Sequence, residues 1–348
     1  MKYLTVFSIS LFLLGFHTLT AAPSDHPWDL SIYSFENLGK DGDAFKYGTT
    51  YGSVGSGENI FLSGYSVDAG NQLATWPQAA FAGGDFSSKN GSVYGDLEVG
   101  GNLYLYGVGY ADTARVGGNL VGRNATFSGT AYLGGQNQSN LSITGDVFTN
   151  QAYMPTFDHS KAKDVFQAAS SYWGSLNPTA SWVNQWGKIQ VGDLQSGRNI
   201  VDISLDDIAS AWGIGLTGPA DAFVIFNITD STVTGDDLLK RVSFQLSGGL
   251  GMEDILFNIT NAESLTLQSG NYASILAPGA DLNLASTSVI GSLVGENIYG
   301  SGSARDTPFA GYMVDQDHFI TSVPEPHTWL ILGSLLLFSL TQTKKAFY

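Results

Sequence analysis

The feature that most constrains this chain is a pair of adjacent glycines that recurs every 17 residues. The four copies are Gly83-Gly84, Gly100-Gly101, Gly117-Gly118 and Gly134-Gly135. A short, fixed sequence period is typical of solenoids, in which each repeat forms one coil that stacks on its neighbours. We therefore predict a mainly β fold, a β-solenoid (β-helix) with coils of about 17 residues.

The residues around each doublet predict a strand followed by a tight corner. Leu97 and Val99 alternate with Glu98 just before the second doublet, which is typical of a strand with one buried face. The residues after the doublets carry amide or acid side chains: Asp85, Asn102, Asn119 and Gln136. We expect the glycines to form corners at which the backbone adopts positive φ, and these side chains to hydrogen-bond up the stack.

The same signature returns far downstream. The segment Val294-Gly-Glu-Asn-Ile-Tyr299 matches Val99-Gly-Gly-Asn-Leu-Tyr104, and Gly57-Glu-Asn-Ile-Phe61 belongs to the same set. The simplest geometry is one solenoid whose coils come from both halves of the chain, with the middle of the sequence inserted between them.

One accompanying α-helix is expected near residues 158–174. Asp158 can cap its start, and apolar residues such as Val165, Phe166 and Ala169 fall on one face at helical spacing. Gly174 is a plausible stop. We expect this helix to pack along the solenoid.

Composition excludes several functional classes. The chain has 348 residues and no cysteine, so it has neither disulfides nor thiolate metal sites. Its formal net charge of −16 opposes binding to nucleic acid, which requires a basic surface. We find no motif for a cofactor, and we expect none to be bound.

The N-terminal residues 1–22 have the pattern of a cleavable signal peptide. Lys2 precedes an apolar run from Leu4 to Leu14, and small residues precede Pro23. We therefore expect export through the secretion translocon, with the solenoid domain spanning residues 23–322.

The C-terminal residues 323–348 have the pattern of a sorting segment. Pro324-Glu325-Pro326 precedes an apolar stretch at 329–340, and Lys344-Lys345 follow. Twelve residues rise about 18 Å as a helix, which is short of a bilayer core of roughly 30 Å. Basic residues after this transmembrane helix would hold the extreme end in the cytoplasm.

This tail resembles the PEP-CTERM sorting signal of Gram-negative bacteria. The resemblance implies recognition by an exosortase, a membrane protease-transferase. It also implies a protein held transiently in the inner membrane and then moved to the cell surface or extracellular matrix. The tail departs from the usual signal in having lysines in place of an arginine cluster and three residues after them.

The body resembles the choice-of-anchor A family of surface proteins. The residues that carry the resemblance are the glycine repeats, Gly57-Glu-Asn-Ile-Phe-Leu-Ser-Gly-Tyr-Ser-Val67, Asp254-Ile-Leu-Phe-Asn-Ile259 and Ser274-Ile-Leu-Ala-Pro-Gly-Ala280. The last of these also looks similar to ice-binding β-helix domains, and matrix-binding adhesins share the wider family. The resemblance implies a β-solenoid with a helix beside it and leaves the ligand open.

A polysaccharide-active enzyme is one alternative function. Asp236-Asp237 follow Gly235 as in pectin-cleaving hydrolases, and Asp206-Asp207 form a second acidic pair. The Gly-His-Gly and Arg-Ile-Lys partners of those hydrolases are absent, and no histidine lies in a recognisable site. These absences favour a non-catalytic protein.

Ice binding is the other alternative, and it would need a flat face with regular rows of Thr or Ala. The outward rows visible in the sequence mix sizes and charges: Phe81, Glu98, Arg115, Tyr132; and Ser87, Tyr104, Val121. Tyrosines that suit stacking on sugar rings include Tyr104, Tyr106, Tyr132 and Tyr299. We expect an exported, non-catalytic adhesive or structural protein of the extracellular polysaccharide matrix.

Overall fold

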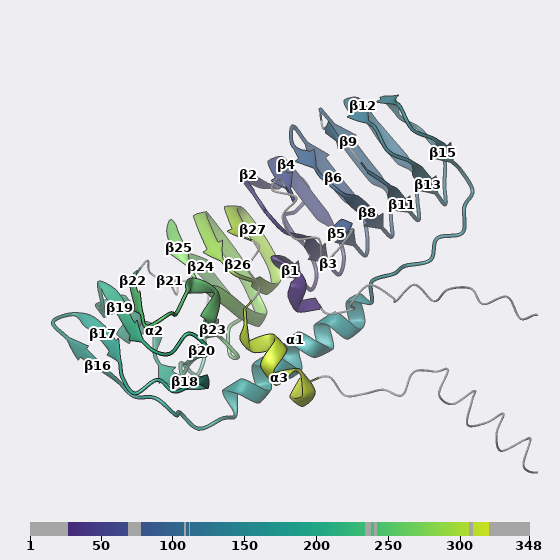
Figure 1. The fold of residues 1–348 in the computed structure, drawn as a ribbon. Coiled ribbons are helices and arrows are strands. Elements are labelled where there is room, and N and C mark those ends of the chain that lie inside the picture. The colour runs from purple at the N-terminus through teal and green to yellow at the C-terminus, as the bar shows by residue number, and fades with distance from the viewer. Residues whose placement is uncertain are drawn as a thin grey trace, which may run out of the picture.

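The computed structural model describes residues 27–68, 78–107, 109–110, 112–233, 238–239, 242–305 and 309–319. They form an elongated stack of parallel β-coils with a long helix along one side (Figure 1). The predicted mainly β fold with β-helix architecture is confirmed. Residues 1–22 and 323–348, with the expected signal peptide and sorting segment, lie outside the described residues, as do Asp236 and Asp237.

Within the described residues, the N-terminal half contributes fifteen strands. They are β1 (Ile32–Ser34), β2 (Phe45–Thr49), β3 (Val54–Ser56), β4 (Ile60–Val67), β5 (Gln78–Ala82), β6 (Phe86–Lys89), β7 (Ser92–Val93), β8 (Asp96–Val99), β9 (Leu103–Tyr106), β10 (Gly109–Tyr110), β11 (Ala114–Val116), β12 (Leu120–Phe127), β13 (Ala131–Leu133), β14 (Asn140–Ile143) and β15 (Val147–Phe148).

From residue 159 on, the described residues contain twelve strands and three α-helices. The strands are β16 (Trp182–Gln185), β17 (Lys188–Val191), β18 (Gly197–Ile203), β19 (Gly213–Thr217), β20 (Ala222–Ile228), β21 (Leu238–Leu239), β22 (Ser243–Ser247), β23 (Ile255–Asn258), β24 (Ser264–Leu267), β25 (Gly270–Tyr272), β26 (Ser274–Ile290) and β27 (Leu293–Arg305). The helices are α1 (His159–Gly174), α2 (Leu205–Ser210) and α3 (Gly311–Phe319), and short 3-10 turns lie at Pro27–Asp29 and Met252–Asp254.

The two halves of the chain meet in the middle of the solenoid. The chain starts there with β1, builds coils to the end at β15, returns along the side as α1, and builds the remaining coils from the opposite end (Figure 1). The second half closes on the first where Ile32 of β1 pairs with Leu293 of β27. On its other side Ile32 pairs with Val54 of β3. One solenoid therefore contains coils from both halves, and the middle of the sequence supplies α1 and the coils at the far end.

The coils stack in parallel register. In the coils that carry the glycine doublets, paired residues are 17 positions apart, as where Ala114 pairs with Leu97 on one side and Ala131 on the other. Elsewhere the spacing between paired residues varies. It is shorter where Ser288 pairs with Ser303, and longer where Ile60 pairs with Phe86 and where Gly197 pairs with Ala222.

The parallel ladders divide the surface into three faces. The first face contains β1, β3, β5, β8, β11 and β13, and the second contains β6 and β9 with the first part of β12. We call the remaining face the third face. It consists of β7, β10 and β25, together with the C-terminal parts of β2, β4, β12, β14, β26 and β27.

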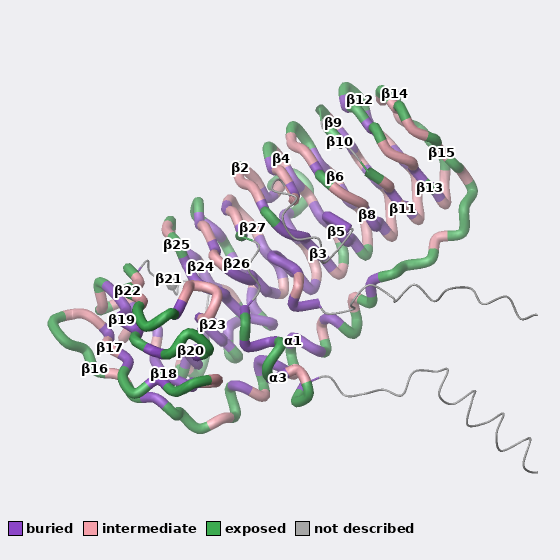
Figure 2. Tube along the Cα trace, viewed as in Figure 1, coloured by how far each residue is buried: buried purple, intermediate pink, exposed green. Residues whose placement is uncertain are grey.

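Two apolar cores hold the fold together. Buried residues recur along the coils and along α1 (Figure 2). The first fills the solenoid with inward-facing side chains such as Phe86, Leu103 and Leu120. The second lies between the first face and α1, where Phe166 and Trp173 are buried. Asp158 caps α1 by accepting a hydrogen bond from the Lys161 amide at 3.0 Å, as expected. The sequence did not predict α3, which packs against α1 in this second core.

Part of the first face that the sequence predicted to be exposed is covered. Phe81 and Glu98 are buried beneath the chain that leads from β15 to α1. The Glu98 carboxylate accepts hydrogen bonds from the amides of Thr156 at 2.8 Å and Phe157 at 3.2 Å. Within the part of the chain that the structure describes, no helix has the length and apolar character needed to cross a bilayer.

Candidate functional site

The eight doublet glycines lie at the corners between the first and second faces, but not for the reason that we expected. None of them has positive φ. A Cβ atom at Gly100 would lie 2.1 Å from the carbonyl oxygen of Gly83, and one at Gly117 would lie 2.2 Å from that of Gly100. Glycine is needed because the previous coil occupies the space of a side chain. The prediction of left-handed backbone at these corners was wrong.

The side chains after the doublets form a hydrogen-bonded ladder. The Asn102 side-chain oxygen accepts from the Asn119 amide at 2.9 Å, and the Asn119 oxygen accepts from the Gln136 amide at 2.8 Å. One step earlier, the Asp85 carboxylate accepts from the Asn102 amide at 2.6 Å. Because these groups bond to one another, the row stabilises the stack and is a poor candidate for a ligand site.

The ladder also crosses the junction between the two halves. The Asn297 side-chain oxygen accepts from both the backbone and the side-chain nitrogen of Asn37 at 3.1 Å. Asn37 in turn accepts from the Asn59 side chain at 3.0 Å. A corner row that we predicted from the glycine repeats therefore also joins the C-terminal coils to the N-terminal ones.

Left-handed backbone occurs instead at the corner between the second and third faces. Tyr47, Gly64, Asn90, Gly107 and Asn124 occupy equivalent places in successive coils, and each has positive φ. Asn and Gly tolerate this conformation best. The 17-residue spacing of Asn90, Gly107 and Asn124 was the signal in the sequence that could have revealed this corner.

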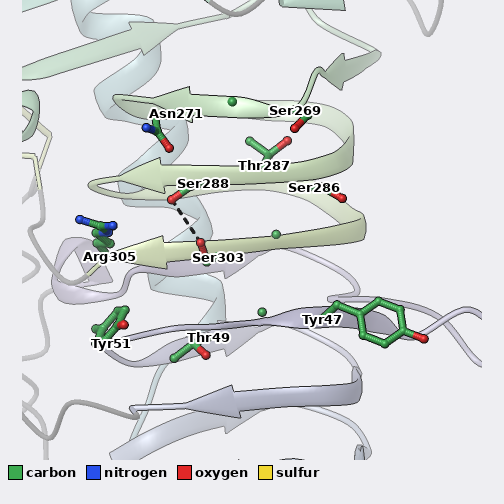
Figure 3. A pocket seen from close by; sticks show the side chains of 13 residues that line it. Tyr47, Thr49, Tyr51, Ser269, Asn271, Ser286, Thr287, Ser288, Ser303 and Arg305 are labelled. Carbon is green, nitrogen blue, oxygen red and sulfur yellow. Dashed lines mark hydrogen bonds between the residues drawn. The ribbon is translucent and has the colours of Figure 1, made fainter.

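A groove of about 480 Å³ lies on the third face where the two halves meet (Figure 3). A central column of polar side chains runs along the solenoid axis: Asn271, Ser288, Ser303 and Thr49. Tyr51 and Arg305 lie on one side of this column, and Ser286 and Tyr47 lie on the other. The Ser303 hydroxyl donates to the Ser288 hydroxyl at 3.2 Å.

The sides of this groove carry exposed aromatic rings. The Tyr47 side chain is 79% exposed and that of Tyr51 is 41% exposed. Glycine backbone at Gly48, Gly270 and Gly302 keeps the floor low between them. Aromatic rings beside hydroxyl, amide and guanidinium groups are the chemistry that binds sugar rings and their hydroxyls.

A row of small residues, all polar except Gly109, continues from the groove along the third face. Its members, in coil order, are Asn271, Ser288, Ser303, Thr49, Ser66, Ser92, Gly109, Thr126 and Ser142. None of them is buried. Sequence analysis missed this row because the third-face strands are too short to show an alternating pattern, although Ser92, Gly109 and Thr126 follow the 17-residue period.

The acidic pair that the structure describes acts as a helix cap. Asp207 accepts from the Ser204 hydroxyl at 2.5 Å, and its own amide donates to that hydroxyl at 3.0 Å. Asp206 lies beside it in the first turn of α2. The described residues contain no cluster of His, Asp and Glu suited to hold a metal ion.

His159 stacks on Tyr33 with ring centroids 6.2 Å apart. Burial lowers its pKa to about 4, against an opposing effect of Asp158. The Tyr33 hydroxyl lies 3.3 Å from its Nδ1 atom. The ring therefore belongs to the packing between α1 and the first face.

Residues 79–305 match the family model of the ice-binding-like adhesive domain. The chain belongs to this family. A search of curated proteins finds no match.

Two solved structures of ice-binding proteins are similar to the chain. The protein of the Antarctic ascomycete Antarctomyces psychrotrophicus is 16% identical, with a TM-score of 0.28, and the match covers 59% of this chain and 93% of that one. The protein of an Antarctic bacterium of the Flavobacteriaceae is 10% identical, with a TM-score of 0.29, and the match covers 81% and 97%.

Proposed function

We propose that this protein is an exported, non-catalytic adhesin that binds an extended polysaccharide along the third face of its solenoid. Membership of a family of adhesive domains supports a binding role at the cell surface. The observation that carries the proposal is the groove between Tyr47 and Tyr51, with its floor of hydroxyl and amide groups. A polymer chain would lie along the solenoid axis because the polar column repeats in that direction.

The groove suits a polymer better than a flat crystal surface. Tyr47 on one side and Tyr51 and Arg305 on the other rise beside a single column of small residues. Sugar rings can stack on the tyrosines while their hydroxyls bond to the column.

The test uses affinity electrophoresis of residues 23–323 in gels that contain neutral or acidic polysaccharides. We expect the polysaccharide in the gel to slow the migration of the wild type but not that of Tyr47→Ala/Tyr51→Ala. The melting temperature of this double variant should be unchanged. Trp186→Ala serves as the control, because Trp186 is 91% exposed and lies outside the groove. If the polysaccharide slows Tyr47→Ala/Tyr51→Ala as much as the wild type, the groove is not the binding site.

Ice binding is the second candidate, and the row of small polar residues on the third face favours it. Hydroxyl side chains repeat there at the strand spacing of about 4.8 Å, as where Thr49 pairs with Ser66. The decisive measurement is thermal hysteresis. If the row binds ice, Ser92→Tyr/Thr126→Tyr will abolish the hysteresis of the wild type, whereas a protein without hysteresis is no ice binder.

The non-catalytic role is part of the same proposal. The Asp207 carboxylate is engaged in its helix cap, which leaves Asp206 without the second free carboxylate that hydrolysis requires. We expect no turnover of uronic-acid or neutral polysaccharides, and we expect Asp236→Asn/Asp237→Asn to leave binding intact. Turnover that this double change abolishes would instead identify an enzyme.

Delivery by an exosortase completes the proposal, and it rests on Pro324-Glu325-Pro326 and Lys344-Lys345. Proline prevents a continuous helix through the junction, which would leave an extended segment for a protease. In cells with the matching exosortase, mass spectrometry should find the surface protein to end near Pro326. Intact Tyr348 on that protein would show that the tail is a plain anchor.

A further inference from the structure

A second hollow lies away from the groove, at the corner between the second and third faces. It measures about 430 Å³, and six residues from three successive coils line it: Lys89, Asn90, Tyr106, Gly107, Arg123 and Asn124. None of these residues belongs to the groove between Tyr47 and Tyr51.

The strand register sets the order of the charged residues in this hollow. Tyr106 pairs with Lys89 on one side and with Arg123 on the other, so Tyr106 lies between two basic residues in adjacent coils. At the usual strand spacing, the backbones of Lys89 and Arg123 are roughly 10 Å apart. The Lys89 ammonium lies 5.9 Å from the centre of the Tyr106 ring.

The left-handed corner shapes the floor of the hollow. Gly107 has a φ of +65°, and a Cβ atom there would lie 2.7 Å from the side-chain oxygen of Asn90. Its missing side chain leaves room between Asn90 and Asn124, which flank it in the adjacent coils. Two amide side chains therefore border a space that opens toward the two cations.

Both cations are available to a ligand. Among the described residues, ion pairs join Lys46 to Asp43 and Arg115 to Asp96, but Lys89 and Arg123 have no acidic partner. Two such neighbouring cations are unusual in a chain with a net charge of −16. They make a local positive site on a surface that otherwise repels anions.

We propose that this hollow binds a carboxylate-bearing sugar residue, a uronic acid within a polysaccharide. Lys89 and Arg123 donate charge-assisted hydrogen bonds to the carboxylate, and Tyr106 packs against the sugar ring. The amides of Asn90 and Asn124 bond to its hydroxyls. The inference rests on the proposed polysaccharide binding and adds to it a preference for acidic polymers.

Isothermal titration calorimetry with galacturonan oligomers tests the proposal. We expect the wild type to bind the de-esterified oligomer and to bind its methyl-esterified form at least tenfold more weakly, because the ester removes the charge. Lys89→Gln/Arg123→Gln should weaken binding of the de-esterified oligomer at least tenfold. Lys161→Gln/Lys188→Gln removes the same charge elsewhere and should change the affinity less than twofold.

Two results would overturn the proposal. One is equal affinity of the wild type for both oligomers, or no binding of either. The other is an equal loss in the two charge variants, because that would show a general effect of net charge. Binding of a neutral glucan oligomer by the wild type and by Tyr47→Ala/Tyr51→Ala is measured in parallel. A failure of the groove to bind is then seen separately from a failure of the hollow at Lys89 and Arg123.

Discussion

At the scale of single residues, the contacts around each glycine explain its presence better than the backbone angle does. Gly117 has ordinary φ, but the carbonyl oxygen of Gly100 would lie 2.2 Å from its Cβ atom. Gly192 is exposed, and a Cβ atom there would have nothing within 4 Å. The two glycines therefore differ in their tolerance of a methyl group.

We expect Gly117→Ala to lower the free energy of unfolding by about 3 kcal/mol, because the added carbon must separate two stacked coils. Gly192→Ala should change it by less than about 0.5 kcal/mol. Urea unfolding followed by circular dichroism measures both. Similar midpoints for the two variants would contradict the steric explanation.

His159 makes stability depend on pH. Its pKa is lowered to about 4 in the folded protein by burial, from an ordinary value of 6.5. Between these values the unfolded chain binds more protons, so stability falls as pH falls from about 6.5 to about 4.

At pH 5 the loss relative to neutral pH should be up to about 2 kcal/mol from this residue. His159→Phe keeps an aromatic ring and removes the titration, so its stability should fall less between pH 7 and pH 5. Urea unfolding at the two pH values gives the difference. An identical fall in both proteins would show that His159 is protonated equally in the folded and unfolded states.

At the scale of elements, a buried carboxylate attaches α3 to the rest of the fold. Asp315 is 4% exposed and accepts from the Trp173 indole of α1 at 2.8 Å. Its other oxygen accepts from the Arg198 guanidinium of β18 at 2.5 Å. The helix directly before the C-terminal segment is thus joined to both α1 and the solenoid.

Asp315→Ala should destabilise the protein by about 3 kcal/mol, because it leaves a buried indole N–H without its partner and removes the counter-charge of Arg198. Asp317→Ala makes the same charge change at an exposed position of α3 and should cost little. The melting temperatures of the two variants and the wild type give the comparison. If Asp315→Ala has the same melting temperature as the wild type, the contacts of Asp315 with Trp173 and Arg198 do not stabilise the attachment of α3.

At the scale of the whole molecule, the path of the chain makes the two halves interdependent. β1 pairs with β3 of its own half and with β27 of the other. The second core also combines both halves, because Tyr33 and Phe81 pack in it with Ile225 and Leu256. Neither half can bury its edge strand or its outer apolar face without the other.

We therefore expect one cooperative unfolding transition in spite of the repeated architecture. Tryptophan fluorescence reports mainly α1 and the C-terminal coils, where Trp173, Trp182, Trp186 and Trp212 lie, while circular dichroism reports all the strands. The two signals should change at the same urea concentration. A second step in circular dichroism without a fluorescence counterpart would mean that the N-terminal coils unfold alone.

The solenoid, its polar ladder and helix α1 could be predicted because each depends on contacts between neighbouring coils or turns. A residue such as Asn102 meets its counterpart Asn119 in the next coil, so the period of the sequence is also the period of the structure. The sequence therefore determined by itself the β-helix class, the glycine corners and the amphipathic face of α1.

Only the tertiary structure decided which outward-facing rows of side chains remain exposed, and which side chains from distant parts of the sequence line one groove. Phe81 and Glu98 point away from the solenoid axis as predicted, yet a segment from another part of the chain buries them. The groove needs Tyr47 and Arg305 on opposite sides of one polar column, and their spacing follows no repeat because it arises where β27 closes on β2. Contacts between residues so far apart depend on the path of the whole chain, and a local sequence pattern contains no information about that path.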